Sequence, residues 1–171
     1  PSVINGSAAN SILAGNFTLS GGLTIASGKL TPGAAGANPG TVTVNGNLAA
    51  TGANATLSVD INGTTAGSGY DQVVVAGTVA PGTASVLTVA ATYTPVVGDQ
   101  FMIVTNDGAD AVTGSFSGLP EGAVVIVGGK ACRISYAGGD GNDVVLRALT
   151  AYVWTPTAAG TYNWDNGGGQ D

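Results

Sequence analysis

Residues 73–79 read Val-Val-Val-Ala-Gly-Thr-Val, and phrases of this kind decide the fold. An apolar run leads into a glycine beside a small polar residue, and apolar residues then resume. Related phrases occupy residues 17–25, Phe-Thr-Leu-Ser-Gly-Gly-Leu-Thr-Ile, and residues 42–48, Val-Thr-Val-Asn-Gly-Asn-Leu. Alternation of this length is typical of strands with one buried face, and its recurrence after roughly 25–30 residues indicates stacked coils.

The composition of the 171-residue chain favours strands and turns over helices. Charged residues make up only 8% of the chain, and 29 residues are glycine. Valine and threonine suit a pleated surface, and glycine and asparagine accept turn conformations, so we expect an all-β protein with almost no helix. The apolar runs are far shorter than the ~18 residues that a membrane-spanning helix needs, so no transmembrane helix is predicted.

The charged residues argue against nucleic-acid binding and against catalysis. The formal net charge is −6, and four scattered cations cannot form the basic patch that phosphate neutralisation requires. Histidine is absent, which removes the commonest catalytic base and transition-metal ligand. The acids, Asp60, Asp71 and Asp99 among them, do not recur at coil spacing. We therefore predict no enzyme activity, no catalytic residue and no cofactor.

The pattern divides the chain into three parts. Residues 1–105 are predicted to form the β-solenoid rungs, with a loop at 32–40 and a fully buried strand near 98–105. Residues 106–149 are predicted to form a sheet-like or sandwich-like closing region, because apolar runs recur there about every ten residues. Those runs are 112–116, 123–127, 131–136 and 143–149. Within the rungs, Asn45-Gly46 marks either a two-residue hairpin turn or the corner of a coil.

Residues 150–171 differ from the rest because they hold both tryptophans of the chain. Tyr152 and Trp154 precede a turn-rich stretch, and Tyr162 and Trp164 follow it, which predicts an aromatic hairpin that leads to a next module or a partner. We interpret the four rings as cross-strand pairs within this hairpin. The alternative is a flat aromatic platform for a surface glycan.

One turn matches a calcium motif. Residues 138–146, Gly-Gly-Asp-Gly-Asn-Asp-Val-Val-Leu, fit the nine-residue repeat of calcium-binding β-rolls. Asp140, Asn142 and Asp143 are the candidate ligands, because Ca²⁺ binds six to eight oxygens and glycine-rich turns expose carbonyl groups. Each ion in a β-roll is shared between adjacent repeats, however, and this chain has a single copy. We favour an ordinary Asp/Gly turn, with calcium as the alternative.

Five phrases, in this order, carry a resemblance to a known family. They are Gly28–Gly33, Tyr70–Val79, Gly98–Val104 with Asn106, Phe116–Gly122 and Ile134–Leu146. Over about residues 20–165 the chain resembles the passenger regions of autotransporter-type proteins, and more narrowly those with autotransporter-associated β-strand repeats. The tryptophan-rich tail is similar to the opening of the next repeat. The resemblance implies a right-handed parallel β-helix, secretion to the cell surface, and no catalytic residues.

These observations lead to one functional hypothesis and one alternative. We expect an extracellular or bacterial cell-surface module that builds a stalk, fibre or filament without catalysing a reaction. Its partners would be other copies of itself or adjacent modules, joined end to end, because uncapped solenoid ends and bare sheet edges are templates for another chain. The alternative is an adhesin module that binds glycan or a host surface. The single cysteine, Cys132, is expected to be a small buried hydrophobe.

Overall fold

A computed structural model describes residues 2–5, 11–34, 38–107 and 109–149, and within these ranges the protein is all-β without a helix. The strands are β1 (Ser2–Asn5), β2 (Ile12–Gly15), β3 (Phe17–Leu19), β4 (Leu23–Pro32), β5 (Thr41–Val44), β6 (Leu48–Ala50), β7 (Ala55–Ile61), β8 (Gln72–Val75), β9 (Val79–Pro81), β10 (Val86–Ala91), β11 (Gln100–Asn106), β12 (Val124–Val127), β13 (Lys130–Gly138) and β14 (Asp143–Ala148).

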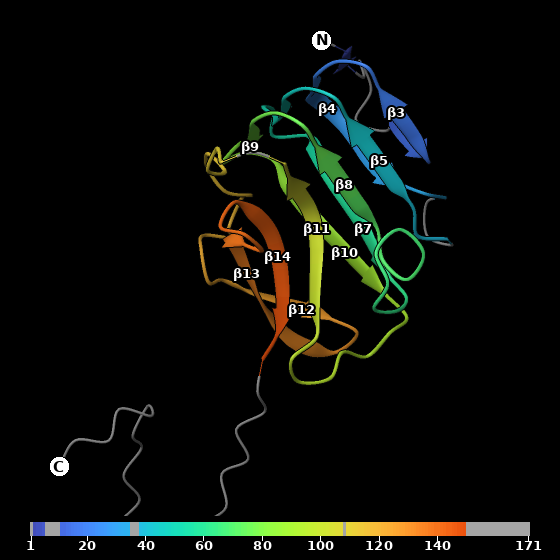
Figure 1. The fold of residues 1–171 in the computed structure, drawn as a ribbon, viewed down its shortest axis with the longest axis vertical. Helices are drawn as coiled ribbons and strands as arrows, with labels where there is room; N and C mark the ends of the chain where they lie inside the picture. Colours follow the sequence, from blue (N-terminus) through green and yellow to red (C-terminus); the bar gives the residue numbers. More distant parts are fainter. Residues whose placement is uncertain (1, 6–10, 35–37, 108, 150–171) are drawn as a thin grey trace, which may run out of the picture.

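The strands form two seven-stranded sheets. The first has the order β10-β7-β4-β6-β9, with β1 and β2 also paired to β4, and all of its pairs are parallel. The second has the order β12-β13-β14-β11-β8-β5-β3; its pairs are parallel from β3 to β11 and antiparallel from β11 to β12. Figure 1 shows β3, β5, β8 and β11 side by side, with β7 and β10 behind them.

The parallel pairs join residues at corresponding places in the repeated phrases. In the first sheet, Leu23 pairs with Leu48, 25 positions later, and Leu48 pairs with Val79, 31 positions later. In the second sheet, Val42 pairs with Val73, which in turn pairs with Val104. Because side chains alternate between the faces of a strand, pairing in this register keeps one set of apolar side chains on the inner face throughout. The alternation in the sequence thus predicted the buried face correctly.

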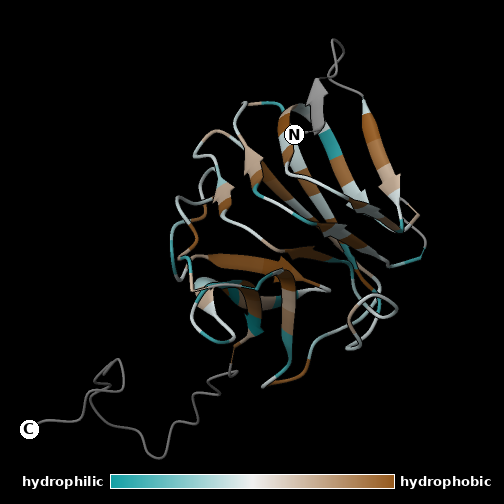
Figure 2. Ribbon diagram, turned by 45° about the horizontal axis from the view of Figure 1, so that its top comes forward, coloured by the Kyte–Doolittle hydropathy of each residue, from teal (hydrophilic) through white to brown (hydrophobic). Residues whose placement is uncertain are grey.

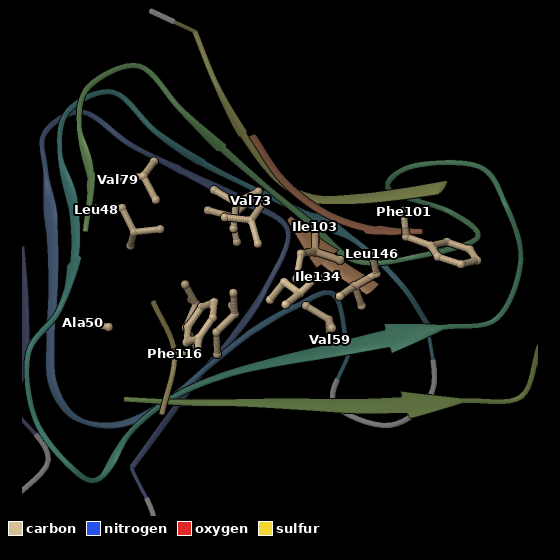
Figure 3. Packing of buried hydrophobic residues seen from close by; sticks show 14 of the residues in the cluster. Leu48, Ala50, Val59, Val73, Val79, Phe101, Ile103, Phe116, Ile134 and Leu146 are labelled. Atoms are coloured by element: carbon tan, nitrogen blue, oxygen red, sulfur yellow. The ribbon is translucent and has the colours of Figure 1, made fainter. Parts of the chain in front are cut away.

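One continuous apolar cluster fills the space between the sheets. Figure 2 shows hydrophobic residues concentrated on the strands and hydrophilic ones in the connections. In Figure 3 the side chains of Leu48, Val79 and Val73 point inward from different strands, and Phe116 lies among them. An apolar cavity of about 20 Å³ lies beside Phe116; it is about the size of one water molecule and is too small for a larger ligand.

The closing region predicted for residues 106–149 continues the second sheet. Strand β14 pairs antiparallel with β11, β13 pairs antiparallel with β14, and β12 pairs antiparallel with β13. The predicted strand at 112–116 was wrong. The backbone N–H of Phe116 donates instead to the Tyr136 hydroxyl at 2.9 Å, and that hydroxyl donates to the Leu119 carbonyl at 2.7 Å. The Tyr136 side chain thereby holds the backbone of Phe116 in place of a strand partner, and the Phe116 ring is buried.

Asn45-Gly46 forms a corner between two strands that belong to different sheets, and not a hairpin turn. The glycine is required here by a close approach of backbones. A Cβ atom at Gly46 would lie 2.5 Å from the backbone nitrogen of Gly22, and one at Gly77 would lie 2.8 Å from the carbonyl carbon of Gly46. Three glycines of three successive phrases therefore stack on one another.

Gly46→Ala is expected to lower the free energy of unfolding by about 1–3 kcal/mol, because the new methyl group would push apart two backbone segments. Urea denaturation followed by circular dichroism would measure the change. Gly21→Ala is the matched control: a Cβ there meets nothing within 4 Å, so this substitution should leave stability unchanged or slightly higher. Equal losses in the two variants would contradict the stacked corner.

Candidate functional site

The turn that matched the calcium motif joins two antiparallel strands, β13 and β14. Asp140 is exposed, whereas Asn142 and Asp143 are buried. The Oδ1 atom of Asp143 accepts the backbone N–H of Asn106 at 2.9 Å, so this carboxylate links the turn to β11. Among the described residues no group of three or more His, Cys, Asp or Glu side chains could hold a metal ion. Calcium binding at Asp140, Asn142 and Asp143 stays the untested alternative to an ordinary Asp/Gly turn.

Adding EGTA is expected to leave the midpoint of thermal unfolding unchanged, because the carboxylate of Asp143 already serves as a hydrogen-bond acceptor within the protein. Differential scanning calorimetry in calcium-containing buffer, with and without the chelator, would test this. A ligand that binds only the folded state at a hundredfold excess over its dissociation constant stabilises by about 2.7 kcal/mol. A midpoint that falls on chelation would therefore establish a calcium site.

The burial of a second acidic residue, Asp71, was not predicted from the sequence. Asp71 is completely buried, and each of its carboxylate oxygens accepts a backbone N–H: Gly40 donates at 2.8 Å and Asp60 at 2.9 Å. Gly40 immediately precedes β5 and Asp60 lies in β7, so one side chain joins segments of both sheets. Because both oxygens are occupied and shielded from solvent, Asp71 holds the fold together and cannot reach a substrate.

Burial raises the pKa of Asp71 to about 6 from its ordinary 3.8; the two N–H donors lower it in part, and the nearby charge of Asp60 raises it further. A pKa that is higher in the folded state means that the folded protein binds more protons between pH 3.8 and 6. The contribution of Asp71 to stability is therefore fully present below pH 3.8 and is lost as the pH rises through 6.

The free energy of unfolding is accordingly expected to be higher at pH 5 than at pH 7 by about 1–1.5 kcal/mol, because at pH 5 only part of the difference between the folded and unfolded pKa values is expressed. Urea titrations at several pH values would show it. The contribution of Asp71 is isolated by Asp71→Asn, which has no ionisable group and should lose this part of the pH dependence. If wild type and Asp71→Asn show the same slope between pH 5 and 7, the prediction is wrong.

Asparagine side chains connect successive strands outside the core. Asn16 Oδ1 accepts the backbone N–H of Thr41 at 2.8 Å, and Asn47 Oδ1 accepts that of Thr78 at 3.0 Å. The donors are 25 and 31 positions further along the chain, which are the spacings of the parallel ladders. These contacts continue the hydrogen bonding where the backbone turns from one sheet to the other. We interpret them as structural contacts.

The aromatic residues predicted to interact with a partner, Tyr152, Trp154, Tyr162 and Trp164, lie outside the described residues. Leu149, the last described residue before them, lines a hollow of about 430 Å³ that was not predicted from the sequence. Residues 95–97 line one side of it, and residues 130, 131, 148 and 149 line the other. Val96 and Val97 are about 60% exposed there (61% and 60%). The signal in the sequence was an apolar pair, without alternation, between Pro95 and Gly98.

None of the described residues forms a helix long and apolar enough to cross a membrane. Among known proteins, no family model matches this chain, and no curated protein matches it either.

Proposed function

We propose that this chain is a right-handed parallel β-helix module of an extracellular structural or surface-scaffold protein, non-catalytic, and a building block of a stalk, fibre or filament of the autotransporter-passenger type. The observation that carries the proposal is the register of the parallel ladders, in which Leu23, Leu48 and Val79 follow one another at spacings of 25 and 31 residues. Stacking of successive repeats of this length is how solenoids extend along one axis.

The two ends of the stack differ in a way that supports end-to-end assembly. On the side of β11, the second sheet continues through the antiparallel strands β14, β13 and β12. On the other side, β3 is the last strand of its sheet. Its residue Phe17 is only half-buried, whereas the paired residues Val42 and Val73 are completely buried. An open strand edge with a half-buried apolar residue is a template for a further strand.

The test is association of the purified chain, followed by sedimentation velocity at rising concentration and by negative-stain electron microscopy. Elongated oligomers are expected from the intact chain, and removal of residues 150–171 should abolish them. Thr18→Lys places a charge on the exposed face of the β3 edge and should weaken association. Thr83→Lys, at an exposed turn away from this edge, is the control. A chain that stays monomeric at all concentrations, or oligomers unchanged by the deletion, would contradict the proposal.

A further inference from the structure

The hollow between residues 95–97 and the ends of β13 and β14 is a preformed apolar surface. It is open to solvent, and its volume is about 430 Å³, within the size range of small-ligand sites. Apart from Lys130 at the rim, the lining side chains are apolar: Pro95, Val96, Val97, Ala131, Ala148 and Leu149. Two adjacent valine side chains exposed beside this hollow offer apolar area whose burial would favour the binding of an apolar group.

The turn that displays the two valines is firmly held. The Oδ2 atom of Asp99 accepts the Tyr93 hydroxyl at 2.8 Å and the backbone N–H of Val96 at 2.9 Å. The carbonyl of Asp99 accepts the N–H of Ala148 at 2.9 Å, which ties the turn to β14. Tyr93 in turn packs edge-on against Phe101, with ring centroids 6.3 Å apart. The valines are therefore presented outward on a braced turn.

The chain leaves the described fold from the wall of this hollow. Leu149 lines it, and its backbone N–H donates to the Ala131 carbonyl at 3.0 Å. An extended chain spans at most about 3.3–3.6 Å per residue, so the Cα atom of Tyr152 can lie at most about 11 Å from that of Leu149, and the Cα atom of Trp154 at most about 18 Å. Linkage over so few residues gives the two aromatic side chains a very high effective concentration at the hollow. They are also two positions apart, which places both rings on one side of an extended segment.

We propose that residues 152–154 of the same chain dock in this hollow, with the rings of Tyr152 and Trp154 against Val96 and Val97. The ammonium group of Lys130 at the rim can then contact an aromatic face. Docking in this way would fix the direction in which residues 155–171 leave the module. The contact is intramolecular, so it does not depend on the assembly proposed above.

Tryptophan fluorescence tests the docking directly, because both tryptophans of the chain lie in residues 150–171. In a Trp164→Phe background, Trp154 is the only tryptophan. Its emission maximum in the full chain is expected at shorter wavelength, and its quenching by acrylamide to be weaker, than in the peptide 150–171 carrying the same substitution. Val97→Asp should shift both readings toward those of the peptide. Val97→Ser, a milder change, should do so in part.

The control is Ile12→Asp, because Ile12 is exposed to a similar extent, 57% against 60% for Val97, and lies on β2. This variant should leave the emission of Trp154 unchanged. Emission equal to that of the peptide, or emission unaffected by Val97→Asp, would overturn the docking. A blue shift that is lost on dilution would also overturn it, since the occupant would then be the tail of a second copy. A monomeric chain with a concentration-independent blue shift would support docking while contradicting the assembly.

Discussion

Asp71→Ala is expected to lower the free energy of unfolding by about 2–6 kcal/mol at pH 5. The substitution leaves the backbone N–H groups of Gly40 and Asp60 without acceptors, and both residues are buried. An unsatisfied buried donor costs about 1–3 kcal/mol, and two are created here. The loss should be smaller at pH 7, because the wild-type protein then carries a buried charge that the alanine variant does not.

Urea denaturation at both pH values would measure these losses. Asp110→Ala is the matched control, since it removes the same charge from an exposed side chain and should change stability by no more than about 0.5 kcal/mol. Asp71→Asn keeps one acceptor oxygen, so its loss of unfolding free energy should lie between those of Asp71→Ala and Asp110→Ala. A loss at pH 5 no larger than that of Asp110→Ala would show that the two N–H groups find other partners.

Asp71 also shows where sequence reasoning reached its limit. Most strands were predictable because the alternation of apolar residues depends only on which face is buried, and Val42 and Val73, which begin two of the repeated phrases, lie in register. Nothing local distinguishes Asp71 from a solvated acid beside a strand. Its burial results from segments 11 and 31 positions away that converge on it, Asp60 and Gly40.

The positions of the corners could be predicted from the sequence, but the reason why glycine stands there could not. Asn45-Gly46 was expected to tolerate positive φ, yet among the described residues only glycines have positive φ, and Gly46 is not one of them. Gly28, by contrast, has a φ of 90° inside β4, where the strand changes partners from β6 to β7. This glycine bend lets a single strand join two ladders.

The site predictions share the same limit. The candidate calcium residues were found from a local motif, but the role of Asp143 depends on its contact with Asn106, 37 positions away. The hollow beside Val97 combines three segments of the chain. A surface formed by distant segments leaves no regular spacing in the sequence from which it could be predicted. The repeat that builds the ladders does leave one, because the same apolar pattern recurs along the chain.

Phe101→Ala is expected to lower the free energy of unfolding by about 3–5 kcal/mol, the usual range for a buried phenylalanine. Phe101 is completely buried in β11 and packs edge-on against Tyr70, with ring centroids 5.5 Å apart, as well as against Tyr93. β11 joins the parallel and antiparallel parts of the second sheet, since Val104 pairs both with β8 and with β14. Loss of this ring should therefore destabilise both parts together.

Two probes can follow the two parts separately. Circular dichroism reports on all strands, whereas the single cysteine, Cys132, is buried in β13 and reports on the antiparallel part. Burial raises the pKa of its thiol, so it should react with a disulfide reagent only when that part opens.

Phe17→Ala, at a half-buried position on the β3 edge, is the control and should lower the free energy of unfolding by only about 1–2 kcal/mol. In Phe101→Ala the unfolding transitions from thiol labelling and circular dichroism should coincide at the same lower urea concentration. Labelling of Cys132 well before the loss of strand signal would mean that β12–β14 open independently, and that the antiparallel strands are an appended cap and do not share one cooperative core with the ladders.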